Sequence, residues 1–210
     1  MDSTVAHPNL ATFRKFVERL QASWLAFQEQ RQKRLMQQQR NGAAAEKVAE
    51  NILEDFFTIA LDWQLGDMNN QLQYADIVLT NRGIKRLLVE VKRPGSLKLD
   101  QLSLEQALSQ ARRYADEQRV RTIAVSDGAL FYAADIVNGG LQRRSYLRLD
   151  ATAHSLDAWW VSTDGIYRTP ASLGGADSAT APVTAAGGTD TNAAPATAEP
   201  VLLHPKHKAH

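Results

Sequence analysis

A short apolar run near the middle of the chain, RLLVEVKRP at residues 86–94, ends in charged side chains and limits the folds that the chain can adopt. Its leucines and valines predict a buried strand that Pro94 terminates. Glu90 and Lys92 stand two residues apart at the end of this strand, and side chains two apart share one face of a strand. We therefore expect a carboxylate and an ammonium group to emerge together there.

The segment just before this run, YADIVLT at residues 74–80, predicts the neighbouring strand. Thirteen residues lie between Asp76 and Glu90, enough for one strand to finish, turn at residues 81–83 and return as its antiparallel partner. Such a hairpin would bring Asp76 beside Glu90.

A long helix is predicted over residues 9–39, because its apolar side chains recur at three-and-four spacing and form one stripe. The stripe consists of Phe13, Phe16, Val17, Leu20, Trp24 and Phe27, and we expect the polar residues 29–34 and 37–40 to continue the helix in solvent. The stripe needs a partner surface, which is the protein's own core or, as the alternative, a dimer contact.

A second helix is predicted over residues 43–61, after the break at Asn41-Gly42. Glu46 lies seven and eleven residues before Leu53 and Phe57, which places it on the buried side of this helix. Glu50 is nearly as well placed. A carboxylate on that side needs a metal, a positive charge or water as its partner. The alternative is a pair of solvated glutamates at a helix start, where the helix dipole favours them.

A polar connection is expected at residues 66–70 and a third helix after Pro94, with Ser103 as its N-cap and Gln106 completing a capping box. Gln110 and Tyr114 follow one another at one-turn spacing along this helix, where they could present an amide and a phenol to a ligand. Later elements are strands at residues 120–125, 129–132 and 145–150 and a short helix at 156–161. The Ala- and Thr-rich residues 171–210 predict a disordered tail.

Composition allows one ordinary domain, since 210 residues with 44% hydrophobic content can bury a stable core. The chain has no cysteine, no signal-peptide pattern at its start and no apolar run long enough to span a bilayer, so we expect a soluble, cytoplasmic protein without membrane contact. The net charge is only +1, but residues 82–121 hold ten Lys or Arg against five Asp or Glu. This basic sector suits a phosphate backbone; solvated helix and turn charges are the alternative.

The order of these elements resembles the PD-(D/E)XK nuclease superfamily, and more narrowly the nuclease domain at the N-terminus of type I restriction enzyme R subunits and its stand-alone relatives. The residues that carry the resemblance are Glu46, Ala75-Asp76-Ile77, the segment VEVKRP at 89–94 and the segment QARRY at 110–114, which fits the Gln-x-x-x-Tyr element shared with RecB-like nucleases. The chain departs from the family pattern by having Ala75 where a proline usually precedes the aspartate. It also lacks a phosphate-binding Gly-Lys-Ser/Thr loop, so ATP-driven translocation does not carry over.

The resemblance implies an α/β, restriction-endonuclease-like fold with a mixed central sheet of four or five strands flanked by helices. Residues 1–42 would form an N-terminal helical extension, residues 43–170 the nuclease-like domain, and residues 171–210 the tail. The implied activity is that of an Mg²⁺-dependent DNA endonuclease related to restriction or defence, with Mn²⁺ able to substitute. DNA would be its partner, together with a second copy of the chain or a specificity or motor subunit.

Phosphodiester hydrolysis needs a hard cation to neutralise charge and to activate water. Asp76, Glu90 and the backbone carbonyl of Val91 would hold this cation, and Glu46 would bind through water or complete a second metal position. Lys92 would orient the attacking water and stabilise the developing charge. By the resemblance, Gln110 and Tyr114 would contact the DNA backbone or hold the Lys92 region in place. We expect further DNA contacts from Arg93 and Arg113.

Three other interpretations stay open at this point. A degenerate nuclease fold would bind DNA or a protein without cleaving. A cluster of ion pairs at Asp76, Glu90 and Lys92 would have no ligand, although burying charges for stability alone is unfavourable. Within the enzymes, a RecB-like repair exonuclease would differ from an endonuclease by preferring free ends to closed circles.

Overall fold

The strand-like and amphipathic segments assemble into a six-stranded sheet with helices on both faces. A computed structural model describes residues 10–41, 44–72, 75–98 and 100–168. The strands are β1 (Met68–Leu72), β2 (Ala75–Asn81), β3 (Ile84–Val91), β4 (Thr122–Ser126), β5 (Leu130–Val137) and β6 (Gly140–Arg148). The helices are α1 (Ala11–Asn41), α2 (Ala45–Asp55) and α3 (Gln101–Gln118), with a π-helical turn η1 (Phe56–Ala60) and 3-10 turns η2 (Leu65–Asp67) and η3 (Leu156–Val161).

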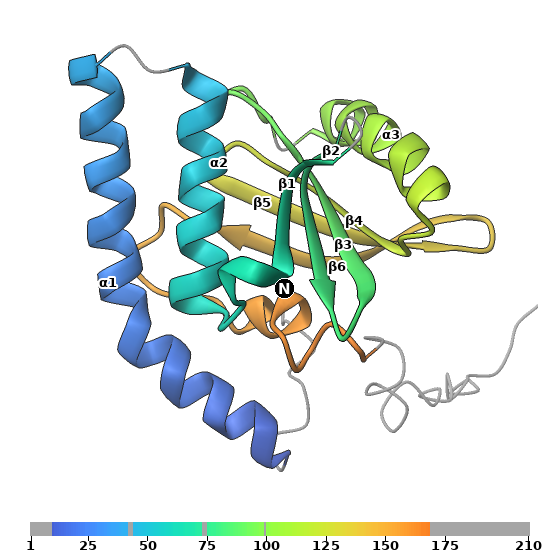
Figure 1. The fold of residues 1–210 in the computed structure, drawn as a ribbon, viewed down its shortest axis with the longest axis horizontal. Helices are drawn as coiled ribbons and strands as arrows, with labels where there is room; N and C mark the ends of the chain where they lie inside the picture. The colour runs from blue at the N-terminus through green and yellow to red at the C-terminus, as the bar shows by residue number, and fades with distance from the viewer. Residues whose placement is uncertain (1–9, 42–43, 73–74, 99, 169–210) are drawn as a thin grey trace, which may run out of the picture. The chain divides into compact units, whose positions relative to one another are not determined.

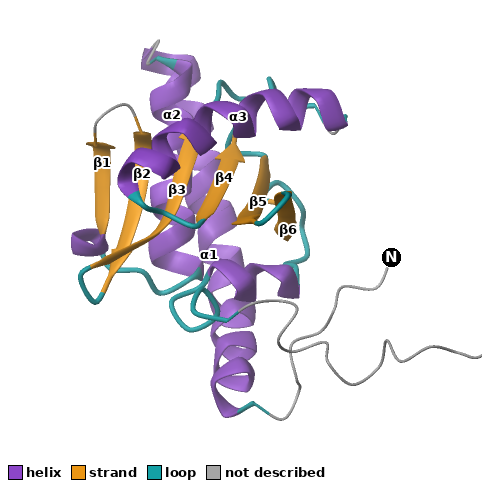
Figure 2. Cartoon of the chain, turned by 90° about the vertical axis from the view of Figure 1, so that its right-hand side faces the viewer, coloured by secondary structure: helices purple, strands orange, loops and turns teal. Residues whose placement is uncertain are grey.

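The strands lie side by side in chain order, from β1 at one edge to β6 at the other (Figure 2). Every neighbouring pair is antiparallel except β3 and β4, which are parallel because α3 carries the chain back across the sheet between them. The predicted mixed sheet is therefore confirmed, but the predicted count of four or five strands is wrong. The extra strand is β1, which has the polar sequence MNNQL and was expected to be a connection. As an edge strand it pairs through its backbone and shows no alternating apolar pattern.

The two faces of the sheet bury different helices, because successive side chains of a strand point to opposite faces. Leu87, Val89 and Val91 of β3 pack on the side of α1, α2, η1 and η3. Leu88 of β3 and Val78 of β2 pack on the other side, against α3. Figure 1 shows α1 and α2 on one side of the sheet and α3 on the other. By the same alternation, Asp76 and Glu90 lie on the α3 side of their strands.

The apolar stripe of α1 packs into the protein's own core, as expected, and shares that core with α2. The two helices therefore form one layer, although they flank the predicted domain boundary at residue 42. The prediction that the end of α1 is solvated is wrong for Arg31, which is buried and donates its Nε–H to the carbonyl of Gly128 at 2.9 Å. It is also wrong for Arg34, which makes a two-bond ion pair with Asp55 of α2 at 2.8 and 3.1 Å.

Several element boundaries differ from the prediction for local reasons. Helix α3 starts three residues earlier than expected, because Asp100 and not Ser103 caps it and accepts the Ser103 backbone N–H at 2.8 Å. The second helix leaves α-helical geometry at Phe56, where η1 begins. Strand β6 begins at Gly140 and includes exposed polar residues. The predicted tail at 171–210 lies outside the described residues, and no described helix is long and apolar enough to cross a bilayer.

Candidate active site

The hairpin of β2 and β3 positions the two central carboxylates. Its two-residue turn consists of Arg82 and Gly83, both with positive φ (52° and 73°), which is the geometry that joins antiparallel strands most tightly. The last backbone pair of the hairpin is Ile77 with Val89, and continuing this register places Asp76 opposite Glu90. The strands end there, and Asp76 Oδ2 accepts the Val91 backbone N–H at 2.6 Å. The predicted neighbourhood of Asp76 and Glu90 is thus present.

Lys92 lies where β3 leaves the sheet, and its ammonium group bridges the sheet and α3. Its Nζ donates to Glu90 Oε1 at 2.8 Å and to Gln110 Oε1 at 3.2 Å. Its backbone N–H donates to the Ser126 carbonyl at 2.8 Å, which holds the residue beside the end of β4. The structure therefore brings together Asp76, Glu90, Lys92 and Gln110.

Burial dominates the electrostatics of the two carboxylates. Glu90 is only 4% exposed, and its Oε2, although shielded from water, has no hydrogen-bond donor among the residues that the structure describes. Burial raises the pKa of Glu90, against the opposing effect of Lys92. Burial likewise raises the pKa of Asp76, while the bond from Val91 lowers it and the nearby Glu50 raises it further. The site thus holds more negative charge than its own lysine and amides neutralise.

These residues fit a hard divalent cation. Asp76 and Glu90 supply oxygen ligands from neighbouring strands, and the Glu90 oxygen without a partner is a polar group that a cation would satisfy. The part of the chain that the structure describes holds no group of three His, Cys, Asp or Glu side chains arranged as a metal site.

The structure distinguishes the two candidate carboxylates of α2. Glu46 is exposed, with 56% of its side chain accessible, and pairs with Arg93 at 3.3 Å. Glu50 is buried at 8% exposure and pairs with Lys47 at 2.6 Å. Both raise the pKa of Asp76, Glu50 the more strongly, whereas only Glu46 also raises that of Glu90. Both helix carboxylates therefore act on the site, and Glu50 is the buried one.

The remaining predicted DNA contacts lie around the site rather than in it. Arg93 is 74% exposed at its side chain and pairs with Glu46 on the α2 side. Arg113 is exposed on α3, and Tyr114 is half-buried against the core between α3 and the sheet. Of the α3 residues, Gln110 contacts the site directly through Lys92.

Asp127 is a residue of this region that the sequence reasoning missed. It is 1% exposed, and its Oδ2 accepts the backbone N–H groups of Gly95 and Leu97 at 3.0 and 3.2 Å. Its Oδ1 accepts those of Ala129 and Leu130. The carboxylate therefore fixes the loop after Lys92 to the turn after β4. The only sequence signal was Ser-Asp-Gly, which predicts a turn and does not indicate a second loop bound to it.

The arrangement of these groups suits hydrolytic chemistry on a phosphate ester, with two acids, one lysine and one amide converging where two strands diverge. Similarity to known proteins adds nothing to this interpretation. Comparison with protein-family models, with curated proteins and with solved structures finds no significant match to this chain.

Proposed function

We propose that the protein is an Mg²⁺-dependent DNA endonuclease with a restriction-endonuclease-like fold, related to restriction or defence. The observation that carries the proposal is the buried Oε2 of Glu90, which has no hydrogen-bond partner within the described ranges. Glu90 lies opposite Asp76, and its other carboxylate oxygen accepts a bond of 2.8 Å from Lys92. A purely structural ion pair gives no reason for such an oxygen, because an unsatisfied buried carboxylate oxygen destabilises the fold.

Each residue has a distinct role in the proposal. Asp76, Glu90 and the Val91 carbonyl hold the cation, which when bound supplies charge neutralisation and a more acidic water. Lys92 orients a water molecule and donates to the developing negative charge, and Gln110 holds the lysine against α3. Arg93, Arg113 and Tyr114 contact the DNA backbone around the site.

Lys92 and Arg93 after β3 and Arg112 and Arg113 on α3 support DNA as the substrate, because cations beside the carboxylates suit a phosphate backbone. The other basic residues of the 82–121 sector include Lys85, Arg86, Arg119 and Arg121, which line a pocket away from this site. Cutting both strands would require a second copy of the chain or a partner subunit, since one site cleaves one strand at a time. Chemistry alone does not separate an endonuclease from an exonuclease of the RecB type. The two activities are separated by testing whether the protein cleaves closed circular DNA or only DNA with free ends.

The direct test is cleavage of supercoiled plasmid by the purified protein with Mg²⁺, with Mn²⁺ and with EDTA. We expect nicked or linear DNA with either cation and none with EDTA, and no cleavage by Glu90→Gln, which excludes a contaminating nuclease. Cleavage of linear but not closed DNA would replace the endonuclease by an exonuclease. DNA binding without cleavage in any cation would leave a binding module and overturn the enzyme.

A matched pair of variants tests which α2 carboxylate serves the site. Glu50→Gln is expected to lower the cleavage rate about tenfold or more, because residues just outside the ligand set of a metal typically contribute that much. Glu46→Gln is expected to change it less than about fivefold, since its ion pair with Arg93 is exposed. Single-turnover cleavage rates measure both. A larger loss in Glu46→Gln would assign the role to Glu46, as the sequence first predicted.

A further inference from the structure

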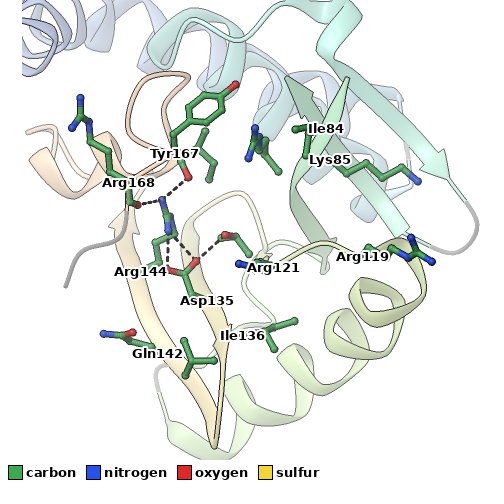
Figure 3. Close-up of a pocket in the computed structure, with 14 residues that line it drawn as sticks. Ile84, Lys85, Arg119, Arg121, Asp135, Ile136, Gln142, Arg144, Tyr167 and Arg168 are labelled. Atoms are coloured by element: carbon green, nitrogen blue, oxygen red, sulfur yellow. Dashed lines mark hydrogen bonds and ion pairs between the residues drawn. The ribbon is translucent and has the colours of Figure 1, made fainter. Parts of the chain in front are cut away.

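A second concave site lies at the opposite end of the sheet from Asp76 and Glu90. The pocket has a volume of about 420 Å³ (Figure 3). It is lined by the start of β3, the connection from α3 into β4, the end of β5 with the first half of β6, and residues 166–168. Strand β3 separates the two sites, and its eight residues span about 23 Å. The pocket is therefore independent of the carboxylate site, and nothing said of it depends on nuclease activity.

The pocket carries a large excess of positive charge. Its lining includes six basic residues and one acidic residue, Asp135; the basic residues are Lys85, Arg86, Arg119, Arg121, Arg144 and Arg168. Asp135 is already used, because it holds Arg144 with bonds of 2.8 and 2.9 Å and accepts from Thr122. Within the described ranges, no carboxylate lies at ion-pair distance from Arg119 or Arg121. The cations repel one another unless an anion joins them.

Two guanidinium nitrogens on the pocket wall also have no bonding partner. The Nε atoms of Arg86 and Arg168 are shielded from water and find no acceptor among the described residues. In Figure 3, Lys85 and Arg119 lie on one side of the pocket and Arg144 and Arg168 on the other, with Arg121 between them. Basic side chains from several elements thus line one pocket. Guanidinium groups in such an array match the paired oxygens of a phosphate group.

Exposed apolar surface gathers at the same pocket. Of the seven large apolar residues that are exposed in the described chain, three line it: Ile84 at 53%, Val137 at 40% and Tyr167 at 40% exposure. The Arg86 guanidinium lies 4.2 Å from the centre of the Tyr167 ring, which fixes the charge beside an aromatic surface. A ligand suited to this wall has an anionic part and a flat apolar part.

We propose that this pocket binds a nucleoside diphosphate or a phosphate ester of similar size. The phosphates lie against Arg86, Arg119 and Arg121, and the base lies on the apolar rim. The volume agrees, because small-ligand pockets usually measure about 300–1,000 Å³. Arg144 acts as the floor rather than as a ligand group, since all of its nitrogens are engaged within the protein.

The test is calorimetric titration of the full chain with ADP, in EDTA so that no metal can bridge the nucleotide to the carboxylate site. Binding of ADP is expected to exceed that of inorganic pyrophosphate, because only ADP uses the apolar rim. Arg121→Ala and Arg86→Met are each expected to weaken ADP binding about ten- to a hundredfold, the usual contribution of a charge-assisted bond. Arg121 is exposed and Arg86 is half-buried, and thermal unfolding of each variant checks that it folds before the titration. Lys33→Ala, an exposed cation on α1, is the matched control and leaves binding unchanged.

Each outcome decides the proposal. Specific loss of ADP affinity in Arg121→Ala and Arg86→Met, with full affinity in Lys33→Ala, supports it. Absence of measurable ADP binding to the wild type, or equal binding by all four proteins, overturns it. Displacement of ADP by a short DNA duplex at a concentration below that of the nucleotide would overturn it in favour of a nucleic-acid surface.

Discussion

Arg144→Met is expected to destabilise the fold by about 3–5 kcal/mol, the usual effect of removing one partner from a buried ion pair. Arg144 is 5% exposed and bonds Asp135 through both carboxylate oxygens. Its other donors reach the carbonyls of Trp160, Gly165, Ile166 and Arg168. Methionine keeps the apolar stem but leaves the Asp135 charge and these carbonyls without their donor. The variant should therefore lose much of a typical total stability of about 5–15 kcal/mol.

Urea unfolding followed by tryptophan fluorescence measures this loss, and the neighbouring residue supplies the control. Arg143 is exposed on the same strand, so Arg143→Met should change the free energy of unfolding by less than about 0.5 kcal/mol. Adding Asp135→Asn to Arg144→Met should recover part of the loss, because it removes the unpaired buried charge. Equal stability of Arg144→Met and Arg143→Met would show that the bonds of Arg144 do not support the segment after η3.

Asp76→Asn is expected to lower plasmid cleavage at least about a hundredfold while making the metal-free protein more stable at neutral pH. The loss of activity follows from replacing an anionic oxygen ligand by a neutral amide. The gain in stability follows from burial, which raises the pKa of Asp76 so that its charge is unfavourable in the folded state. The asparagine oxygen can still accept the Val91 N–H, so the hydrogen bond at 2.6 Å has a substitute.

The raised pKa of Asp76 determines how the stability difference between Asp76→Asn and the wild type changes with pH. A carboxyl group whose pKa is raised on folding destabilises the protein above that raised pKa, and the effect disappears below the unfolded pKa of about 3.9. The stability difference between Asp76→Asn and the wild type should therefore grow as pH rises from 4 and vanish at lower pH. Thermal unfolding across this range measures it, with the exposed Asp116→Asn as control. Added Mg²⁺ should stabilise the wild type alone; a stabilised Asp76→Asn would remove Asp76 from the metal site.

The central hairpin could be predicted from sequence because its signals are local. The apolar run, the Asn-Arg-Gly turn and the two-residue spacing of Glu90 and Lys92 act within a few residues of one another, and the observed ion pair follows directly from that spacing. The apolar stripe of α1 could be predicted in the same way, from the three-and-four spacing of its side chains. Strand β1 was not, because an edge strand is held by backbone pairing that imposes no side-chain pattern.

Local sequence patterns did not predict which of the two α2 carboxylates, Glu46 or Glu50, is buried. Periodicity placed both Glu46 and Glu50 toward the buried side of α2, but whether either is covered depends on how the helix packs on the sheet. That packing exposes Glu46 to Arg93 and buries Glu50. The bond from Lys92 to Gln110 likewise depends on α3 crossing the end of β3.

By itself, the sequence determined the strand pair, the opposition of Asp76 and Glu90, and the helices with apolar stripes, because each depends on interactions between near neighbours in the chain. Tertiary structure alone decided which charges are buried and which groups far apart in sequence meet. It brought Asp127 to the loop after Lys92. It also gathered Arg86, Arg121 and Arg168 around one pocket. The burial of a charge and the meeting of distant side chains depend on how the helices pack on the sheet. Local sequence patterns do not specify that packing.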